Sequence, residues 1–597
     1  MTSSIELASM PVITLEQVRP LGFLFVTLLL CCYLLYQWLL PKPIPGIPYN
    51  VESSRKIMGD IPALLREING TDKTFMDYII KQVKSHDSPV IQLFLSPFRK
   101  PMVIINDFQE SQDLLMRRKE FDRSEFLTDL FGGVSPEHHI MKPTNSSWKA
   151  HRRLLQDLMS PPFLHQVAGP NLYSNVNNLI SLWNFKADVA QERPFSATDD
   201  IYGAALDAIF AFTFGKSFKS NATAPNMHLL QGLSAQDISK LRGDGKDHDK
   251  PLEFPQAPRD KAVTATFDVA HAIEQVNGKP FAKLIWKYVV ARKDRFSTAL
   301  RLKNEYINDE LKAAVARIQN ADSDVRSAVD LMVQRETKIA AKDGRAPDYF
   351  SQVMMDETFG FVVAGHETTS TTILWGMKIL AANPRSQTKL RETLRASYSE
   401  AFKTKRSPTI DEITGTDIPY LDAVMEEILR CGGTVPGVDR QATCDTEILG
   451  YPIKKGTVVL CSGRGASMLE PGFDIDDSKR SETSRLAKTE NRIRAWGNDD
   501  IGAFKPERWL VAAPSSEDST ETAYHFDSTA GPQLAFGLGL RSCFGRRLAY
   551  LELRILLTMI VWNFELLPCP EDLAGFSAIA GITYKPRQCY VRLRKAI

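Results

Sequence analysis

A ten-residue segment near the C-terminal end, Phe536-Gly-Leu-Gly-Leu-Arg-Ser-Cys-Phe-Gly545, constrains this chain more than any other feature. Glycines on both sides of Cys543 allow positive φ angles and let the backbone pass close to a bulky planar group. Arg541 would lower the pKa of the thiol and so favour the thiolate, which is the form that binds metals. Residues 546–562 have the apolar spacing of a helix, whose N-terminal dipole also favours a thiolate. The segment therefore predicts a loop built around one thiolate.

This segment resembles the haem-binding signature of the cytochrome P450 family, Phe-x-x-Gly-x-Arg-x-Cys-x-Gly, at every fixed position. The resemblance implies haem b with Cys543 as the axial thiolate ligand of the iron, which favours cleavage of the O–O bond. It also implies that Phe536, Arg541 and Gly545 bind the cofactor. The fold implied is mainly α with a minor β region, and residues 51–597 would form a single catalytic domain. The alternative for a lone cysteine is a buried apolar residue.

A second motif interrupts the apolar helical pattern of residues 348–382 with Ala364-Gly-His-Glu-Thr-Thr369. Glycine and paired threonines are poor helix formers, which indicates a function other than helix stability. The motif resembles the oxygen-activation element of the same family, in which the glycine leaves room for dioxygen. Glu367 and Thr368 are then the catalytic pair that delivers protons, and His366 occupies a variable position. The alternative is a kink in an ordinary core helix.

Three further residues are predicted to bind the haem propionates. Trp148 and Arg152 are spaced i, i+4 at the start of a helical pattern, so they lie on one face, and they match the family's Trp-x-x-x-Arg element. Arg440 follows a Pro-Gly turn and matches an arginine with which the family often holds a propionate.

A structural triad is predicted from two separate segments. Glu427 and Arg430 are spaced i, i+3 on one helical face, and Arg508 follows at about the distance at which the family places the last residue of a Glu-Arg-Arg triad. A buried carboxylate held by two guanidinium groups would clamp the core beneath the haem. Removal of Glu427 would leave buried cations without a partner.

The N-terminal fifty residues predict a membrane anchor. Residues 1–18 are expected to form a short luminal tail, and residues 19–40 a transmembrane helix, because they include twenty consecutive uncharged positions. Twenty helical residues span about 30 Å, which is one hydrocarbon core. More cations follow this segment than precede it, so the body would face the cytosol. The prolines of residues 41–50 predict a stiff extended hinge, and the resemblance implies the endoplasmic reticulum membrane.

Composition and charge exclude other classes of protein. A net charge of +2 gives no indication of nucleic-acid binding. The eight cysteines include no Cys-x-x-Cys pair and no regular spacing, so neither a zinc site nor a disulfide framework is predicted. Residues 471–495 are charged and lack an apolar period, and are therefore expected to form a disordered surface insertion.

The motifs together favour a haem-thiolate monooxygenase that inserts one atom of dioxygen into a lipophilic small molecule. Resemblance to filamentous-fungal members implies a tailoring step of secondary metabolism, either hydroxylation, epoxidation or successive oxidation. The chain lacks a Gly-x-Gly-x-x-Gly fingerprint after a strand, so NADPH and flavins would act only through a partner, the NADPH-cytochrome P450 reductase. A basic face could steer that partner; its residues would be Arg153, Arg541, Arg546 and Arg547.

Two alternatives remain open. A haem-thiolate isomerase or dehydratase would work without a reductase, but the intact Glu367-Thr368 pair argues against it. A membrane-anchored haem sensor without catalytic activity is the other, and the chain has no segment left for a signalling module.

Overall fold

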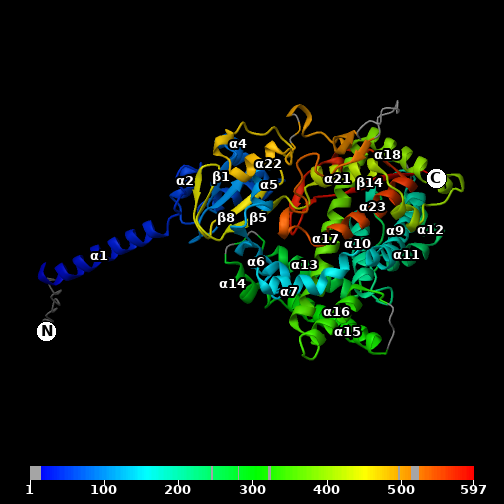
Figure 1. The fold of residues 1–597 in the computed structure, drawn as a ribbon, viewed down its shortest axis with the longest axis horizontal. Coiled ribbons are helices and arrows are strands. Elements are labelled where there is room, and N and C mark those ends of the chain that lie inside the picture. The colour runs from blue at the N-terminus through cyan, green and yellow to red at the C-terminus, as the bar shows by residue number, and fades with distance from the viewer. Residues whose placement is uncertain are drawn as a thin grey trace, which may run out of the picture.

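The computed structural model describes residues 15–596, except 244–246, 278, 280, 321–324, 495, 497 and 513–523. The described residues are mainly helical with a minor β region, as predicted. Figure 1 shows the strands β1, β5 and β8 gathered at the side from which α1 emerges, while most helices lie on the other side. The helical part and the sheet part have separate hydrophobic clusters.

Four helices form the centre of the helical part: α9 (Gly169–Ala190), α10 (Thr198–Phe214), α17 (Gln352–Ala382) and α23 (Arg546–Asn563). Almost every residue of α10 is buried, because a helix that is apolar on all sides is stable only inside a core. Its buried Asp200 pairs with Lys186 of α9 at 2.7 Å. α17 is also buried along most of its length and packs against α10, α21 and α23.

Further helices surround these four. On the N-terminal side of the core they are α2 (Val51–Ser54), α3 (Ile61–Ile68), α4 (Phe75–His86), α5 (Phe108–Met116), α6 (Glu125–Phe131), α7 (Ser146–Leu155) and α8 (Pro161–Phe163). In the middle of the chain they are α11 (Thr223–Gln231), α12 (Ala235–Arg242), α13 (Lys261–Glu274), α14 (Ala282–Ile285), α15 (Asp294–Gln319) and α16 (Ala328–Lys342). After α17 come α18 (Pro384–Ser397), α19 (Ser399–Lys403), α20 (Ile410–Gly415), α21 (Pro419–Gly432) and α24 (Glu571–Ala574).

The largest sheet of the described residues has the strand order β1-β2-β8-β5-β3. Its strands are β1 (Val90–Leu93), β2 (Met102–Ile105), β3 (Phe121–Asp122), β5 (Gly437–Ala442) and β8 (Val458–Ser462). β2 and β8 are parallel and the other neighbours are antiparallel. Smaller sheets pair β6 (Thr446–Ile448) with β7 (Tyr451–Ile453), β9 (Leu510–Ala512) with β10 (Tyr524–Phe526), β12 (Ala578–Ala580) with β13 (Tyr584–Pro586), and β11 (Phe564–Leu567) with β14 (Tyr590–Lys595), which also pairs with β4 (Phe195–Ser196).

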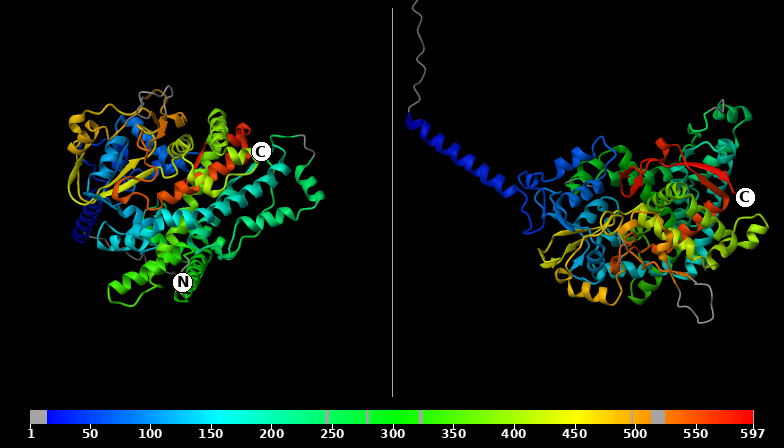
Figure 2. Two further views of the ribbon diagram at one scale, coloured as in Figure 1. Left: turned by 45° about the vertical axis from the view of Figure 1, so that its right-hand side comes forward. Right: turned by 90° about the horizontal axis from the view of Figure 1, so that it is seen from above.

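The N-terminal helix α1 (Leu15–Leu39) stands clear of the body of the protein (Figures 1 and 2). Its side chains from residue 23 to residue 38 are exposed and mostly apolar. Among the residues that the structure describes, no helix is both long enough and apolar enough to cross a membrane, so the transmembrane helix predicted for residues 19–40 is not found there. Most of the predicted tail, residues 1–14, lies outside the described residues.

The proline-rich segment 41–50 contains no helix, in agreement with its composition, but it is not a free spacer. Gln92 of β1 donates from its side-chain nitrogen to the carbonyl oxygens of Ile44 and Ile47, at 2.9 and 2.8 Å, and accepts from the Ile44 amide at 2.7 Å. Both isoleucines are buried. The segment therefore binds the sheet and holds the end of α1 against the body.

The charged segment 471–495 is more ordered than its composition suggests, and the expectation of a disordered loop is wrong for its described residues. It contains α22 (Glu482–Thr489), which Ser481 caps by accepting from the Ser484 amide. Arg480 is buried and donates to Asp107 at 2.7 and 3.2 Å, and Ser481 donates to Asp113 at 2.6 Å. These bonds to the region of α5 order the segment, and a search for apolar periodicity cannot detect them.

Candidate functional site

Cys543 lies between a single 3₁₀ turn, η8 (Gly539–Arg541), and the first residue of α23. Its amide donates to the Phe536 carbonyl at 2.8 Å, which closes the loop on itself. Gly539 has a φ of +70°, and a Cβ there would lie 2.2 Å from the Leu115 carbonyl oxygen of α5. Gly545 instead has a φ of −80° and open space where a Cβ would be. One glycine thus permits the turn, and the other leaves room above the loop.

The sulfur of Cys543 is accessible although the residue lies deep in the molecule. Its side chain is exposed, yet burial is the largest influence on the thiol and raises its pKa. Hydrogen bonds from the backbone of Gly545 and Arg546, and the charges of Arg152 and Arg546, act in the opposite direction. The expectation that Arg541 lowers this pKa is wrong, because Arg541 turns away and donates to Lys142 and Thr144.

The helix α17 lies next to the cysteine loop. The ring of Phe544 lies 6.2 Å from that of Phe361 on α17. Ala364 and Thr368 follow Phe361 along one helical face, and Ala364 is exposed and Thr368 half-buried in a helix that is otherwise mostly buried. The Thr368 hydroxyl donates to the Ala364 carbonyl at 2.7 Å. From this contact we infer that the accessible sulfur and this accessible strip of α17 border one space.

Gly365 does not face that space. A Cβ at this position would lie 2.5 Å from the Ile209 side chain of α10, which is closer than Cβ atoms approach other atoms. The glycine therefore allows α10 and α17 to pack closely, and this differs from the expected role of leaving room for dioxygen.

A cluster of arginines lies at the edge of the space. Burial and the neighbouring charge of Arg123 lower the pKa of Arg541 to about 9, against the attraction of Asp122. Burial and Arg440 lower the pKa of Arg123 to about 10, and burial also lowers that of Arg440. Arg123 Nε and Arg440 Nη2 are buried without a hydrogen-bond partner. Buried cations that repel one another and lack acceptors fit an anionic group that carries more than one charge.

Trp148 connects this cluster to the cysteine loop. The Arg541 guanidinium lies 4.8 Å from the centre of the Trp148 ring, and that of Arg152 lies 5.7 Å from it. Arg152 also lies over the ring of Phe544, at 4.4 Å. The structure thus brings Trp148, Arg152, Arg440 and Arg541 to one side of the space. Arg123, in the segment after β3, belongs to the same group. It was not predicted as a site residue, because its only signal in the sequence was its place in a short run of charged residues.

Glu367 is buried and held by groups from distant segments. Its Oε1 accepts from the Tyr202 hydroxyl of α10 at 3.2 Å and from the Thr583 hydroxyl at 3.1 Å. Lys585 of β13 lies 3.5 Å from the same oxygen. His366, which burial keeps at a lowered pKa, lies 3.8 Å from the other oxygen. Tyr202, Thr583 and Lys585 carried no motif that could have identified them in the sequence.

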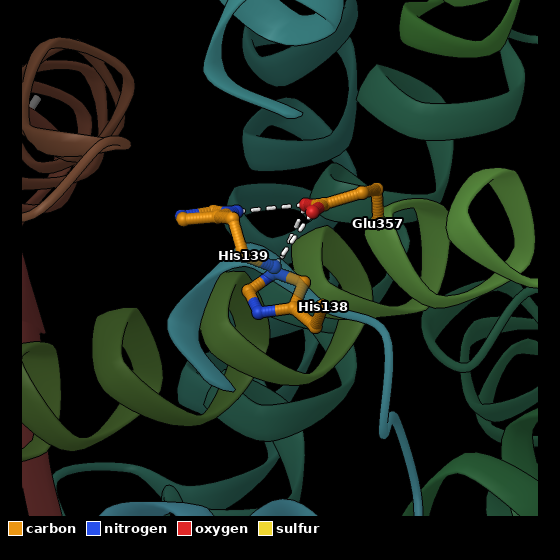
Figure 3. Close-up of side chains that lie close together, drawn as sticks. All are labelled: His138, His139 and Glu357. Atoms are coloured by element: carbon orange, nitrogen blue, oxygen red, sulfur yellow. Dashed lines mark hydrogen bonds and ion pairs between the residues drawn. The ribbon is translucent and has the colours of Figure 1, made fainter. Parts of the chain in front are cut away.

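Three histidines surround a second buried carboxylate on α17, that of Glu357, and Figure 3 shows two of them, His138 and His139. His139 Nδ1 lies 2.7 Å and His138 Nε2 3.3 Å from Oε2, and His151 Nδ1 lies 2.8 Å from Oε1. Although burial opposes it, the histidines hold the pKa of Glu357 well below its usual range. The cluster fastens the segment before α7 and α7 itself to α17.

The positions of His138, His139 and Glu357 would also suit a metal ion. The hydrogen bonds of His138 instead favour a neutral ring that donates its proton to Glu357. The Ile140 amide donates to His138 Nδ1 at 3.2 Å, so the neutral ring carries its proton on Nε2 and directs it to Glu357. A metal bound at Nε2 would require the proton on Nδ1, facing the Ile140 N–H. Burial lowers the pKa of His138 to about 4, which keeps the ring neutral.

Glu427 and Arg430 form a fully buried ion pair on α21. The carboxylate accepts from Arg430 Nε at 2.8 Å and Nη2 at 2.7 Å, from Trp509 Nε1 at 2.9 Å and from the Lys505 amide at 2.9 Å. Arg508 Nε lies 3.9 Å from Glu427, and its closer ion pair is with Asp500 at 2.8 Å. The predicted triad is therefore brought together, but of its two arginines only Arg430 forms hydrogen bonds to the carboxylate.

Comparison with known proteins identifies what this arrangement resembles. A sequence model of the family described as Cytochrome P450 matches residues 64–468 and 502–587. Cytochrome P450 monooxygenase TRI13 of Fusarium sporotrichioides is 45% identical over 95% of this chain and 98% of its own length. Cytochrome P450 monooxygenase GME11363 of Pestalotiopsis microspora is 37% identical over 96% and 98%, and cytochrome P450 monooxygenase xilC of Penicillium crustosum is 38% identical over 96% of each chain.

Proposed function

Because this chain belongs to the cytochrome P450 family of oxygen-incorporating oxidoreductases, we propose that it is a haem-thiolate monooxygenase that tailors a lipophilic small molecule in fungal secondary metabolism. The observation that carries the proposal is the accessible sulfur of Cys543 in a loop that contacts α17 close to the accessible residues Ala364 and Thr368. The similarity to fungal monooxygenases over nearly the whole chain supports the metabolic setting.

The residues around the space fit haem. Cys543 would ligate the iron, and the open position beside Gly545 leaves the loop free of side-chain obstruction. The orphaned donors of Arg123 and Arg440, together with Arg152, Arg541 and Trp148, would hold the two propionates. Bound haem with a cysteine thiolate supplies the activation of dioxygen and the insertion of one oxygen atom into a C–H or C=C bond.

The remaining chemistry that the chain must provide is proton delivery. Thr368 presents its hydroxyl on the accessible face of α17, where the Ala364 carbonyl orients it. Glu367 is the neighbouring carboxyl, and two hydroxyl groups position its Oε1. A hydroxyl at the space with a carboxyl behind it is the arrangement that passes protons inward from the protein.

We further propose that α1 attaches the enzyme to the endoplasmic reticulum membrane, with the catalytic domain in the cytosol. The support is the row of exposed and mostly apolar side chains from residue 23 to residue 38. Electrons would come from the NADPH-cytochrome P450 reductase. Arg546 and Arg547, at the start of α23, are not fully buried and are available to an acidic donor.

The test is reconstitution of the purified full chain with the reductase, NADPH and ¹⁸O₂ against a panel of terpenoid and polyketide substrates. A monooxygenase would consume NADPH only with the reductase present and would place one labelled oxygen in the product. Turnover of an oxygenated substrate without NADPH would instead establish the isomerase or dehydratase alternative. Haem binding without turnover of any kind on the panel, and without substrate-induced spectral change, would favour the sensor.

We expect Arg123→Gln to release haem about tenfold faster than the unchanged protein, since a hydrogen bond to a charged group is worth about 1.5–3 kcal/mol. The haem-free form should unfold at the same or a higher temperature, because the substitution removes one of the mutually repelling buried cations. Haem transfer to apomyoglobin and thermal unfolding measure the two effects. Arg259→Gln, at an exposed arginine paired with Asp199, is the control; equal haem transfer by the two variants would exclude Arg123 from the haem site.

A further inference from the structure

We propose that Lys585 is a positioning residue shared between two carboxylates, Glu274 and Glu367, and that Glu274 controls through Lys585 whether Glu367 can take up a proton. The inference rests on the proposed function, because it assigns Glu367 to proton delivery. It adds two residues from segments that no motif connects to the reaction, the end of α13 and the strand β13.

The distances show that the ammonium group of Lys585 lies close to both carboxylates, Glu274 and Glu367. Lys585 Nζ lies 2.9 Å from Glu274 Oε1 and 3.5 Å from Glu367 Oε1. In this arrangement Lys585 pairs chiefly with Glu274, and hydroxyl groups hold Glu367. A shift of the ammonium by a fraction of an ångström towards Glu367 would reverse the order of the two contacts.

The protonation of Glu367 depends on which contact dominates. An adjacent ammonium stabilises the ionised carboxylate, so Glu367 would resist protonation while Lys585 is paired with it. When Lys585 is paired with Glu274, the nearest partners of Glu367 Oε1 are the hydroxyls of Tyr202 and Thr583, and these can donate to the carboxylate or accept from the protonated acid. Glu274 therefore favours the state in which Glu367 can carry a proton.

Lys585 remains charged in this position. Burial alone would lower its pKa, but the neighbouring Tyr202, Glu367 and Glu274 outweigh burial and raise it. The other titratable groups near Glu367 are His366, whose pKa burial lowers, and Tyr202, whose pKa burial raises. Both are neutral near pH 7, so among the residues that the structure describes Lys585 is the charged group that faces Glu367.

Glu367, Lys585, Glu274 and His271 form a row in which the side chain of Glu367 is the least exposed and that of His271 the most exposed. The side chain of Glu367 is 4% exposed, those of Lys585 and Glu274 are 24% and 22% exposed, and that of His271 is 44% exposed. His271 Nδ1 lies 3.5 Å from Glu274 Oε2. The shared lysine thus stands between the buried acid and groups that exchange protons with water.

The turn between β12 and β13 contacts the end of α13 beside Glu274. Asn277, just after α13, donates from its side chain to the Gly581 carbonyl at 2.6 Å. A Cβ at Gly581 would lie 2.3 Å from Glu274 Oε1, so this glycine is what allows Glu274 to reach Lys585. The position of the turn and the sharing of Lys585 are therefore linked.

The experiment is an infrared pH titration of the Glu367 carboxyl band, identified by its loss in Glu367→Gln, on the resting ferric holoenzyme. We expect Lys585→Met to move the titration midpoint up by about one pH unit or more, as loss of an adjacent opposite charge does. Glu274→Gln should move it down, since Lys585 then has Glu367 as its remaining carboxylate. Lys585→Arg should restore most of the original midpoint. Lys389→Met, at an exposed lysine paired with Glu507, should change nothing.

The double variant, Glu274→Gln with Lys585→Met, distinguishes a lysine that is shared between two carboxylates from two charges that act independently on Glu367. If Glu274 acts through Lys585, then Glu274→Gln has little effect on the midpoint in a Lys585→Met background, whereas independent charges would give additive shifts. Additive shifts, or an unchanged midpoint in a Lys585→Met protein that keeps its haem spectrum, would overturn the proposal. If Lys585→Met does not fold, Glu274→Gln is compared with Lys585→Arg. The midpoint of the Glu367 band should fall in Glu274→Gln and stay close to its original value in Lys585→Arg.

A second measurement connects the pair to turnover. With a substrate in hand, Glu274→Gln should release more hydrogen peroxide per NADPH consumed and show a larger solvent isotope effect than the unchanged enzyme. The infrared titration needs no turnover, so a protein that shows the expected shifts but no oxygen insertion would contradict the proposed function alone. Oxygen insertion without the shifts would contradict the role of Lys585 alone.

Discussion

We expect the Cys543→Ser variant to lose the strongly red-shifted Soret band that the dithionite-reduced, carbon-monoxide-bound protein shows when a thiolate ligates the iron. Serine cannot supply the electron density of a thiolate, so the variant should either bind haem with an ordinary carbonyl band or fail to retain it. Monooxygenase turnover should be lost in both cases. The absorption spectrum of the two proteins, recorded at equal haem concentration, measures the effect.

Cys444→Ser is the matched control, because Cys444 is also an exposed cysteine but lies in the segment between β5 and β6, away from the loop. We expect this variant to keep the red-shifted band. A red-shifted band in Cys543→Ser would show that another residue ligates the iron. If the unchanged, haem-loaded protein lacks the red-shifted band, no thiolate ligates the iron and the proposed monooxygenase mechanism loses its basis.

Glu427→Ala is expected to lower the free energy of unfolding by about 3–5 kcal/mol, the usual cost of removing one partner of a buried ion pair. The variant leaves the Arg430 guanidinium buried without its carboxylate, together with the Trp509 N–H and the Lys505 amide. Glu427→Gln, which retains an acceptor, should lose less. Guanidinium unfolding followed by circular dichroism measures the stability, and the pyridine haemochrome assay measures the haem content.

Glu305→Ala serves as the control, since Glu305 pairs with Arg301 on the same helix but both side chains are more than half exposed. An exposed pair contributes at most about 1 kcal/mol. Equal destabilisation by Glu427→Ala and Glu305→Ala would show that the buried clamp does not stabilise the fold.

The clamp also explains how the fold accommodates the segment that the family model does not match. Arg430 Nη1 donates to the carbonyl oxygens of Met468 and Ile501, at 2.6 and 2.8 Å. The unmatched stretch comprises residues 469–501, so Met468 directly precedes it and Ile501 is its last residue. One buried guanidinium thus holds both ends of the segment that carries α22. Sequence reasoning identified Arg430 by its spacing from Glu427, but the two carbonyls have no sequence signal.

Contiguous motifs allowed the sequence to predict the mainly helical class, the cysteine loop and the helix α17, which runs through the Ala364–Thr369 motif without the predicted interruption. Predictions that depended on the direction of a side chain were less successful. Arg541 turns away from the sulfur because Lys142 and Thr144 supply acceptors. Gly365 serves the contact with Ile209. Residues 471–495 were expected to be irregular because the partners of Arg480 and Ser481, which are Asp107 and Asp113, are more than 350 positions away along the chain.

The sequence by itself determined the family, the fold class and the cysteine predicted to ligate the iron, because each depends on residues that are neighbours along the chain. Only the tertiary structure decided which charges surround that site. Arg123 joins Arg440 and Arg541 across more than 300 residues, and Lys585 reaches Glu367 and Glu274 from the far end of the chain. Electrostatic interactions depend on distance in space and on burial, and folding alone sets both.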